Sequence, residues 1–106
     1  MKTFWIAVME SVTKRPARVR VEGRPVKFEE APGIDFFVYQ HDIEGYTGIS
    51  EVTTGMSIAK EATENEALDL ARARLAKRDI SEIKAIIVTM PPVMELPLHP
   101  YELFGE

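Results

Sequence analysis

Glycine and proline divide the first half of this sequence into short runs that have the residue pattern of β-strands. Residues 3–9 are apolar on both faces, which predicts a central strand covered on both sides. Residues 17–22 alternate apolar and charged side chains, and we expect this half-buried strand to turn at Gly23 and return as a hairpin through residues 26–29. Gly55 is expected to adopt a positive φ in a short turn. The other runs with strand character lie at residues 34–41, 46–52, 56–60 and 83–90.

One segment has helical periodicity instead. Thr63 and Glu66 have the spacing of a capping box, in which each side chain satisfies a backbone N–H at the start of a helix. Over residues 64–77 the acidic side chains come first and the basic ones last, which complements the helix dipole. The apolar side chains that share one narrow stripe of this helix are Ala67, Leu68, Ala71 and Leu75. We therefore expect this helix to lie on a sheet.

The order of these segments predicts the fold class. We expect an α+β domain with an antiparallel, possibly mixed, β-sheet of five to seven strands and one main α-helix, about residues 64–77, packed on one face. A chain of 106 residues has room for one core only. The predicted domain covers residues 1–92, and residues 93–106 form a separate C-terminal tail.

This tail is unusual in composition. Pro97 and Pro100 exclude a long helix or a central strand, yet the tail is rich in large apolar residues, which disordered tails usually lack. We expect it to dock, either on its own domain or on another chain. The apolar residues predicted to make this contact are Leu96, Leu98, Tyr101, Leu103 and Phe104.

Composition excludes several classes of protein. The chain has no cysteine, so it has no disulfide, no thiolate nucleophile and no cysteine-ligated metal. The apolar run at residues 3–9 is interrupted by Glu10, has the minimum length of a signal-peptide core and is followed by no small-residue cleavage site. No run approaches the roughly 18 apolar residues of a membrane helix. We therefore expect a cytoplasmic protein with no membrane contact.

The sequence contains no recognisable catalytic motif. It has no nucleophile elbow, no phosphate-binding glycine loop and no H-E-x-x-H segment, so we expect neither an enzyme nor a cofactor. His41, Asp42 and Glu44 place three metal-ligating residue types in one loop. A polar turn, in which Asp42 bonds the local backbone, explains the same pattern, so we predict no metal site.

Basic residues gather in one part of an acidic chain. The net charge is −4, yet residues 14–27 hold six basic residues and a single acid, Glu22. The candidate contacts to an anion or a nucleic acid are Lys14, Arg15, Arg18, Arg20 and Arg24. The solvent face of a strand is also normally charged, and the overall acidity makes a nucleic-acid partner unfavourable.

The segment around Gly55 is similar to a known group of proteins. Residues 49–59 read Ile-Ser-Glu-Val-Thr-Thr-Gly-Met-Ser-Ile-Ala, and residues 63–67 read Thr-Glu-Asn-Glu-Ala. This pattern resembles small uncharacterised bacterial and phage proteins that share a V-S-E-x-x-T-G-x-x-I-A hairpin followed by T-x-x-E-A and a helix. The resemblance covers residues 37–75 and implies a hairpin-plus-helix module without an activity. HicB-type antitoxins have a similar strand–strand–helix order, but their proline-flanked aspartate–leucine turn is missing here.

These observations favour one functional class over another. We expect a small non-enzymatic binding or accessory module of a bacterial or mobile-element cytoplasm, which acts through protein contacts or self-association. The alternative is a nucleic-acid-binding module that uses the basic strand around Arg18, Arg20 and Arg24.

Overall fold

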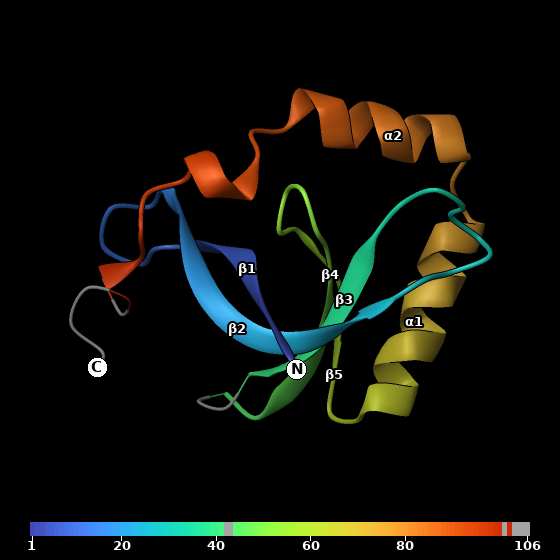
Figure 1. Cartoon of the computed structure of the whole chain (residues 1–106), viewed down its shortest axis with the longest axis horizontal. Helices are drawn as coiled ribbons and strands as arrows, with labels where there is room; N and C mark the ends of the chain where they lie inside the picture. The colour runs from blue at the N-terminus through green and yellow to red at the C-terminus, as the bar shows by residue number, and fades with distance from the viewer. Residues whose placement is uncertain (42–43, 101, 103–106) are drawn as a thin grey trace.

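Five strands follow one another in chain order across a single sheet, and each strand pairs antiparallel with the next (Figure 1). The computed structural model describes residues 1–41, 44–100 and 102. The strands are β1 (Lys2–Met9), β2 (Pro16–Val26), β3 (Phe36–His41), β4 (Tyr46–Glu51) and β5 (Ser57–Glu61). The predicted α+β class, with an antiparallel sheet and one main helix packed on it, is confirmed.

The main helix, α1 (Glu64–Ala76), matches its prediction closely. The Thr63 hydroxyl accepts the backbone N–H of Glu66 at 3.2 Å, which satisfies an otherwise unpaired donor at the helix start. The helix packs against β4 and β5. Of the predicted stripe, Ala67, Ala71 and Leu75 are buried and Leu68 is half-buried. The small alanines let the helix lie close to the sheet.

The last predicted strand, residues 83–90, is wrong. These residues belong to a second helix, α2 (Ile80–Thr89), which begins where the Asp79 carboxylate accepts the Ser81 N–H at 3.0 Å. The run of β-branched residues resembles a strand. However, the side chains that reach the core are Ile80, Ile83 and Ile87, whose spacing is helical.

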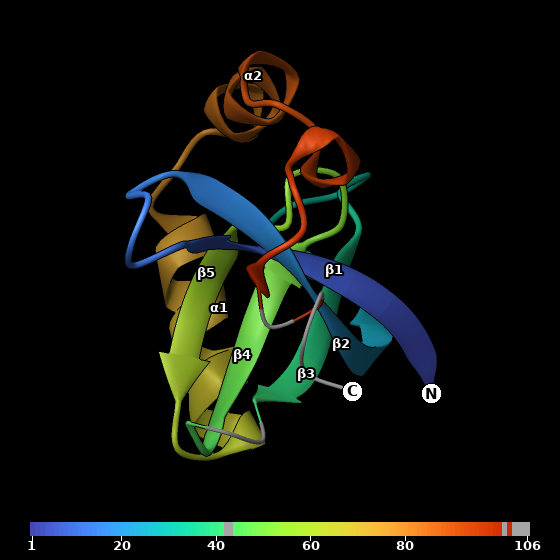
Figure 2. The same ribbon diagram turned by 90° about the vertical axis from the view of Figure 1, so that its left-hand side faces the viewer.

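Two prolines end α2. Met90 is extended, with ψ of 146°, as expected for a residue that precedes a proline. After Pro91 and Pro92 the chain forms a short 3-10 helix, η1 (Val93–Glu95). Figure 2 shows α1 along the sheet, whereas α2 and the turns after it lie across one end of the molecule.

The predicted hairpin at Gly23 is also wrong. Strand β2 runs straight through Gly23, which pairs with Lys2 on one side and with Tyr39 on the other. A Cβ atom at Gly23 would lie 2.3 Å from the carbonyl oxygen of Val38. This glycine is therefore required for the close approach of β2 and β3 and not for a turn.

Strand β3 supplies both cores of the domain because alternate side chains point to opposite faces of the sheet. Phe36 and Val38 pack in the cluster beneath α1. Phe37 and Tyr39 pack on the other face, where the sheet curls and brings Ile6 of β1 against them. Phe4 stacks on Phe37 with the ring centroids 4.3 Å apart. All four of these β3 side chains are buried.

The prediction of a central strand at residues 3–9 is wrong, because β1 lies at the edge of the sheet and Ile6 is its one fully buried residue. The turn between β4 and β5 touches the outer edge of β1. The Ala7 N–H donates to the Gly55 carbonyl at 3.0 Å, and the Val93 N–H donates to the Thr53 carbonyl at 2.8 Å. Gly55 has φ of +68°, as predicted from its place in a turn. A Cβ atom there would lie 2.7 Å from Val93 Cγ2, 2.8 Å from the Ala7 nitrogen and 2.9 Å from the Trp5 carbonyl oxygen.

Gly55→Ala should therefore destabilise the protein strongly. The left-handed conformation alone costs a non-glycine residue about 1–2 kcal/mol, and the clash with fixed backbone adds a similar amount. Gly45→Ala is the matched control, because Gly45 has φ of +72° but, its chain neighbours apart, no atom of the described residues lies within 4 Å of the point that a Cβ atom would occupy. Denaturant melts should show the larger loss for Gly55→Ala, and equal losses would mean that the contact with β1 is unimportant.

The reversal between β1 and β2 is organised by one carboxylate. Glu10 accepts the backbone N–H groups of Thr13 and Val12, which lower the pKa of its carboxyl group to about 2. Lys14 follows with a positive φ of 60°. The turn thus depends on the ionised form of Glu10.

This dependence predicts an acid-sensitive contribution to stability. Because the pKa of Glu10 is lower in the folded chain than its ordinary value of 4.5, its contribution is fully present above that value and is lost as the pH falls through about 2. Urea melts of the wild type and of Glu10→Gln should differ at about pH 6 and converge toward about pH 2. A difference that stays constant with pH would contradict this interpretation.

Candidate functional site

A groove of about 260 Å³ lies between α1, α2 and the start of β5. Leu75 and Ile83 form its floor, and Met56 and Ile86 stand at its sides. Sequence reasoning missed this site because it placed residues 83–90 in a buried strand.

The surface around this groove is more apolar than a strand or helix facing water requires. Ile86, which lines the groove, is 39% exposed, and Met90, one helical turn further along, is 40% exposed. Met56, which also lines the groove, is 37% exposed. Exposed apolar side chains beside a groove make it a candidate binding site. Methionine side chains, which are flexible and polarisable, suit surfaces that adapt to a partner.

The charged groups that line the groove are mainly basic. Arg74 donates to the Ile58 carbonyl at 2.7 Å, and Arg78 lies one helical turn further along the chain. The acidic side chain in the lining, Glu51, is buried. Its carboxylate accepts the N–H groups of Thr53 and Thr54 and the Thr54 hydroxyl, so it is turned inward. The groove therefore combines an apolar floor with a basic rim.

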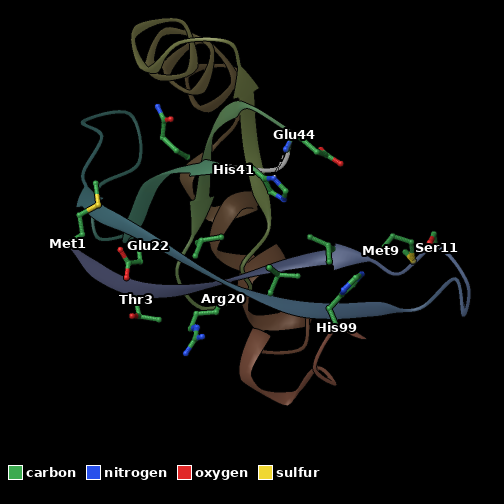
Figure 3. Close-up of a pocket in the computed structure, with 13 residues that line it drawn as sticks. Met1, Thr3, Met9, Ser11, Arg20, Glu22, His41, Glu44 and His99 are labelled. Carbon is green, nitrogen blue, oxygen red and sulfur yellow. Dashed lines mark hydrogen bonds between the residues drawn. The ribbon is translucent and has the colours of Figure 1, made fainter. Parts of the chain in front are cut away.

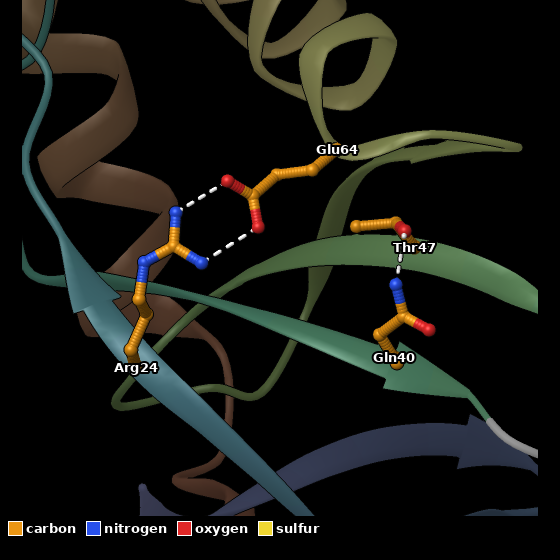
Figure 4. A network of polar contacts seen from close by, with 4 residues as sticks. All are labelled: Arg24, Gln40, Thr47 and Glu64. Atoms are coloured by element: carbon orange, nitrogen blue, oxygen red, sulfur yellow. Dashed lines mark hydrogen bonds and ion pairs between the residues drawn. The ribbon is translucent and has the colours of Figure 1, made fainter.

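The predicted basic strip does not form one free surface. Arg24 makes a bidentate ion pair with Glu64 of α1 (Figure 4). The hydrogen bonds between the two groups lower the pKa of Glu64 and raise that of Arg24. Arg18 is turned toward the C-terminal segment, where it donates to the carbonyls of Met94 and Leu96. The other three candidates, Lys14, Arg15 and Arg20, are exposed.

The described part of the C-terminal tail lies along β2. The Arg18 N–H donates to the Pro97 carbonyl at 2.8 Å, and the His99 N–H donates to the Arg18 carbonyl at 3.0 Å. Leu96 and Leu98 are half-buried there. Tyr101, Leu103 and Phe104 lie outside the described residues. Two sites that the sequence suggested separately, the basic strand and the tail, are thus in contact with each other.

A wider, open hollow of about 950 Å³ is lined by β1, β2 and the end of β3 (Figure 3). Figure 3 shows His41 beside Glu44 at its margin. His41 Nδ1 accepts the Glu44 N–H at 3.2 Å, which is the contact of a polar turn, and its ring stacks on Tyr46. The pKa of Tyr46 is raised, first by burial and then by a hydrogen bond with Tyr39.

The described residues contain no group of three or more side chains that could hold a metal ion. Asp42, the third residue of the loop considered as a ligand set, lies outside them. Within the same part of the chain, no helix is long and apolar enough to cross a membrane. Comparisons with protein-family models, with curated proteins and with solved structures found no match to this chain.

The contacts of Arg18 and Arg24 predict weak binding to nucleic acid. Because both guanidinium groups already bond within the chain and the net charge is −4, we expect no sub-micromolar binding to duplex DNA or RNA at about 150 mM salt. A gel shift measures this directly. Tight binding that falls steeply with salt and is lost in Arg20→Ala would instead support the basic-strand alternative.

Proposed function

We propose that this chain is a small non-enzymatic binding module that acts through protein contacts, and that the groove beside α2 is its contact surface. The observation that carries this proposal is the exposure of apolar side chains on α2 next to an apolar groove. Burial of such side chains against a partner removes apolar area from water, which is the main driving force of association.

The size and lining of the groove favour a protein segment over a small molecule. Its volume of about 260 Å³ lies below the roughly 300–1,000 Å³ of ordinary ligand pockets. Exposed apolar side chains also continue along one face of α2 from Ile86 to Met90. An amphipathic helix laid along a groove is a common mode of recognition and covers such a strip. Arg74 and Arg78 on the rim favour a segment with acidic flanks.

We propose that this module acts in a bacterial or phage-related cytoplasm. The similarity of residues 37–75 to small bacterial and phage proteins supports that origin. The lack of cysteine is compatible with a reducing compartment.

A display library of amphipathic helical peptides, with this chain as bait, tests the proposal. Enriched peptides should carry acidic flanks, and Ile86→Glu and Met56→Glu should each weaken their binding at least about tenfold, which corresponds to about 1.4 kcal/mol. Both side chains are more than one-third exposed, so the variants should stay folded, and thermal melts verify this.

Val12→Glu is the matched control. Val12 is an apolar residue with 85% exposure in the turn between β1 and β2, away from the groove. Its replacement should leave peptide binding unchanged. A library that yields no binder, or binders insensitive to both groove variants, would refute the proposed surface.

A further inference from the structure

Strand β2 has an edge that β3 leaves uncovered. Strand β1 pairs with β2 over residues 16–23, but β3 pairs with it only over residues 23–26. On the side of β3, the preceding part of β2 accepts the chain's own C-terminal segment in parallel pairing, with Leu98 opposite Arg18. We call residues 94–99 the strap. The strap fills the place of a missing strand.

Arg18 holds the strap through hydrogen bonds to main-chain atoms of the strap, and it uses both its own backbone and its guanidinium to do so. Its own N–H and carbonyl bond to Pro97 and His99. Its Nη1 donates to the Leu96 carbonyl at 3.1 Å and also to the carbonyl of Met94. The guanidinium lies 4.9 Å from the ring centroid of Trp5, a cation–π distance that fixes its plane.

Four side chains of the strap, those of Met94, Leu96, Pro97 and Leu98, add little to this contact. Met94 is 56% exposed, Pro97 is exposed, and Leu96 and Leu98 are only half-buried. Recognition of this kind depends on an extended backbone and not on a particular sequence. Other peptides that add to a sheet edge bind in the same way. Proline favours this backbone because it restricts φ and lowers the entropy lost on binding. Other extended, proline-containing segments offer the same main-chain groups to Arg18.

One donor of Arg18 remains without a partner in this arrangement. Arg18 Nε is buried, and no acceptor among the described residues bonds to it. A buried unpaired donor is unfavourable, and most strongly so in a charged group. An incoming segment with a carboxylate near Nε would satisfy this donor with a charge-assisted hydrogen bond that the strap does not provide.

We propose that Arg18 and Trp5 form a docking site for an extended, proline-containing segment of a partner protein that carries an acidic side chain, with the strap as its exchangeable resident. The acidic side chain pairs with the guanidinium of Arg18, and the partner backbone replaces the strap along β2. This site is distinct from the groove beside α2 and does not depend on it.

Trp5 provides the measurement, since it is the only tryptophan in the chain. The probes are capped synthetic peptides with the sequence of residues 93–100, either unchanged or with Leu96→Glu or Leu98→Glu. Titration of the full chain should change the Trp5 fluorescence, with the better glutamate peptide binding about tenfold more tightly than the unchanged one. A tethered strap competes at about millimolar effective concentration, so weak affinities are expected for the wild type.

Variants of the chain distinguish the contribution of Arg18 to peptide binding from the competition by the strap. His99→Pro removes the N–H donated to Arg18 and should tighten peptide binding about fivefold, whereas His99→Ala keeps that N–H and isolates the effect of the side chain. Arg18→Gln should abolish binding. Arg24→Gln removes the same charge from the same strand and should leave binding intact, because Arg24 contacts Glu64 instead.

Hydrogen exchange on the wild-type chain tests, without any variant, whether the strap detaches from β2. The amide protons of Arg18 and His99 should exchange much faster than those that join β1 to β2. Equal protection would show a permanent strap and overturn the proposal. Peptide binding that survives in folded Arg18→Gln, or a concentration-dependent dimer that exchanges straps and excludes the peptide, would overturn it as well.

Discussion

The contact of Gly55 with β1 is the constraint on which the arrangement of the remaining elements depends. A sheet of five strands in chain order has two open edges, and the β1 edge is closed here by the carbonyl of Gly55. The same turn holds Val93 through the Thr53 carbonyl. Val93 is 3% exposed and thus anchors the start of the C-terminal segment. Three parts of the chain that are distant in sequence meet at a position where only a glycine fits.

That anchor determines where both candidate surfaces lie. Helix α2 connects the end of α1 to the segment that Val93 anchors, and it packs on the core through Ile80, Ile83 and Ile87. Ile86, which lies outside this packed face, lines the groove. Beyond Val93 the chain runs along β2, where it reaches Arg18. A single fixed point therefore positions an apolar helix on one side and an extended segment on the other.

The two proposed surfaces present different chemistry. The groove offers apolar area and a basic rim, features that a partner would contact through its side chains. The edge at Arg18 offers main-chain hydrogen bonds and one guanidinium, features that suit an extended backbone. Residues 94–99 of the chain itself occupy the second surface, whereas Ile86 and Met56 of the first are exposed.

The sequence by itself determined the elements whose causes are local. The cap at Thr63, the positive φ of Gly55 and the strand within residues 34–41 each depend on residues within a few positions, and all three were predicted. Prediction from the sequence failed where the same residues are compatible with two different local structures. The β-branched run at residues 83–90 forms α2 because Asp79 caps a helix and the core accepts every third or fourth side chain. Gly23 sits within a strand because β3 approaches its backbone.

The candidate sites were decided by tertiary structure alone. The sequence identified the basic residues and the apolar tail, but it assigned Arg18 to an external anion and left open what the tail would contact. Only the fold brings Arg18 to the carbonyls of Met94 and Leu96, and only the fold pairs Arg24 with Glu64, forty residues away. Contacts over such separations depend on how far β2 and β3 diverge and on where Val93 is anchored. These are properties of the packed sheet, which local patterns of residues do not encode.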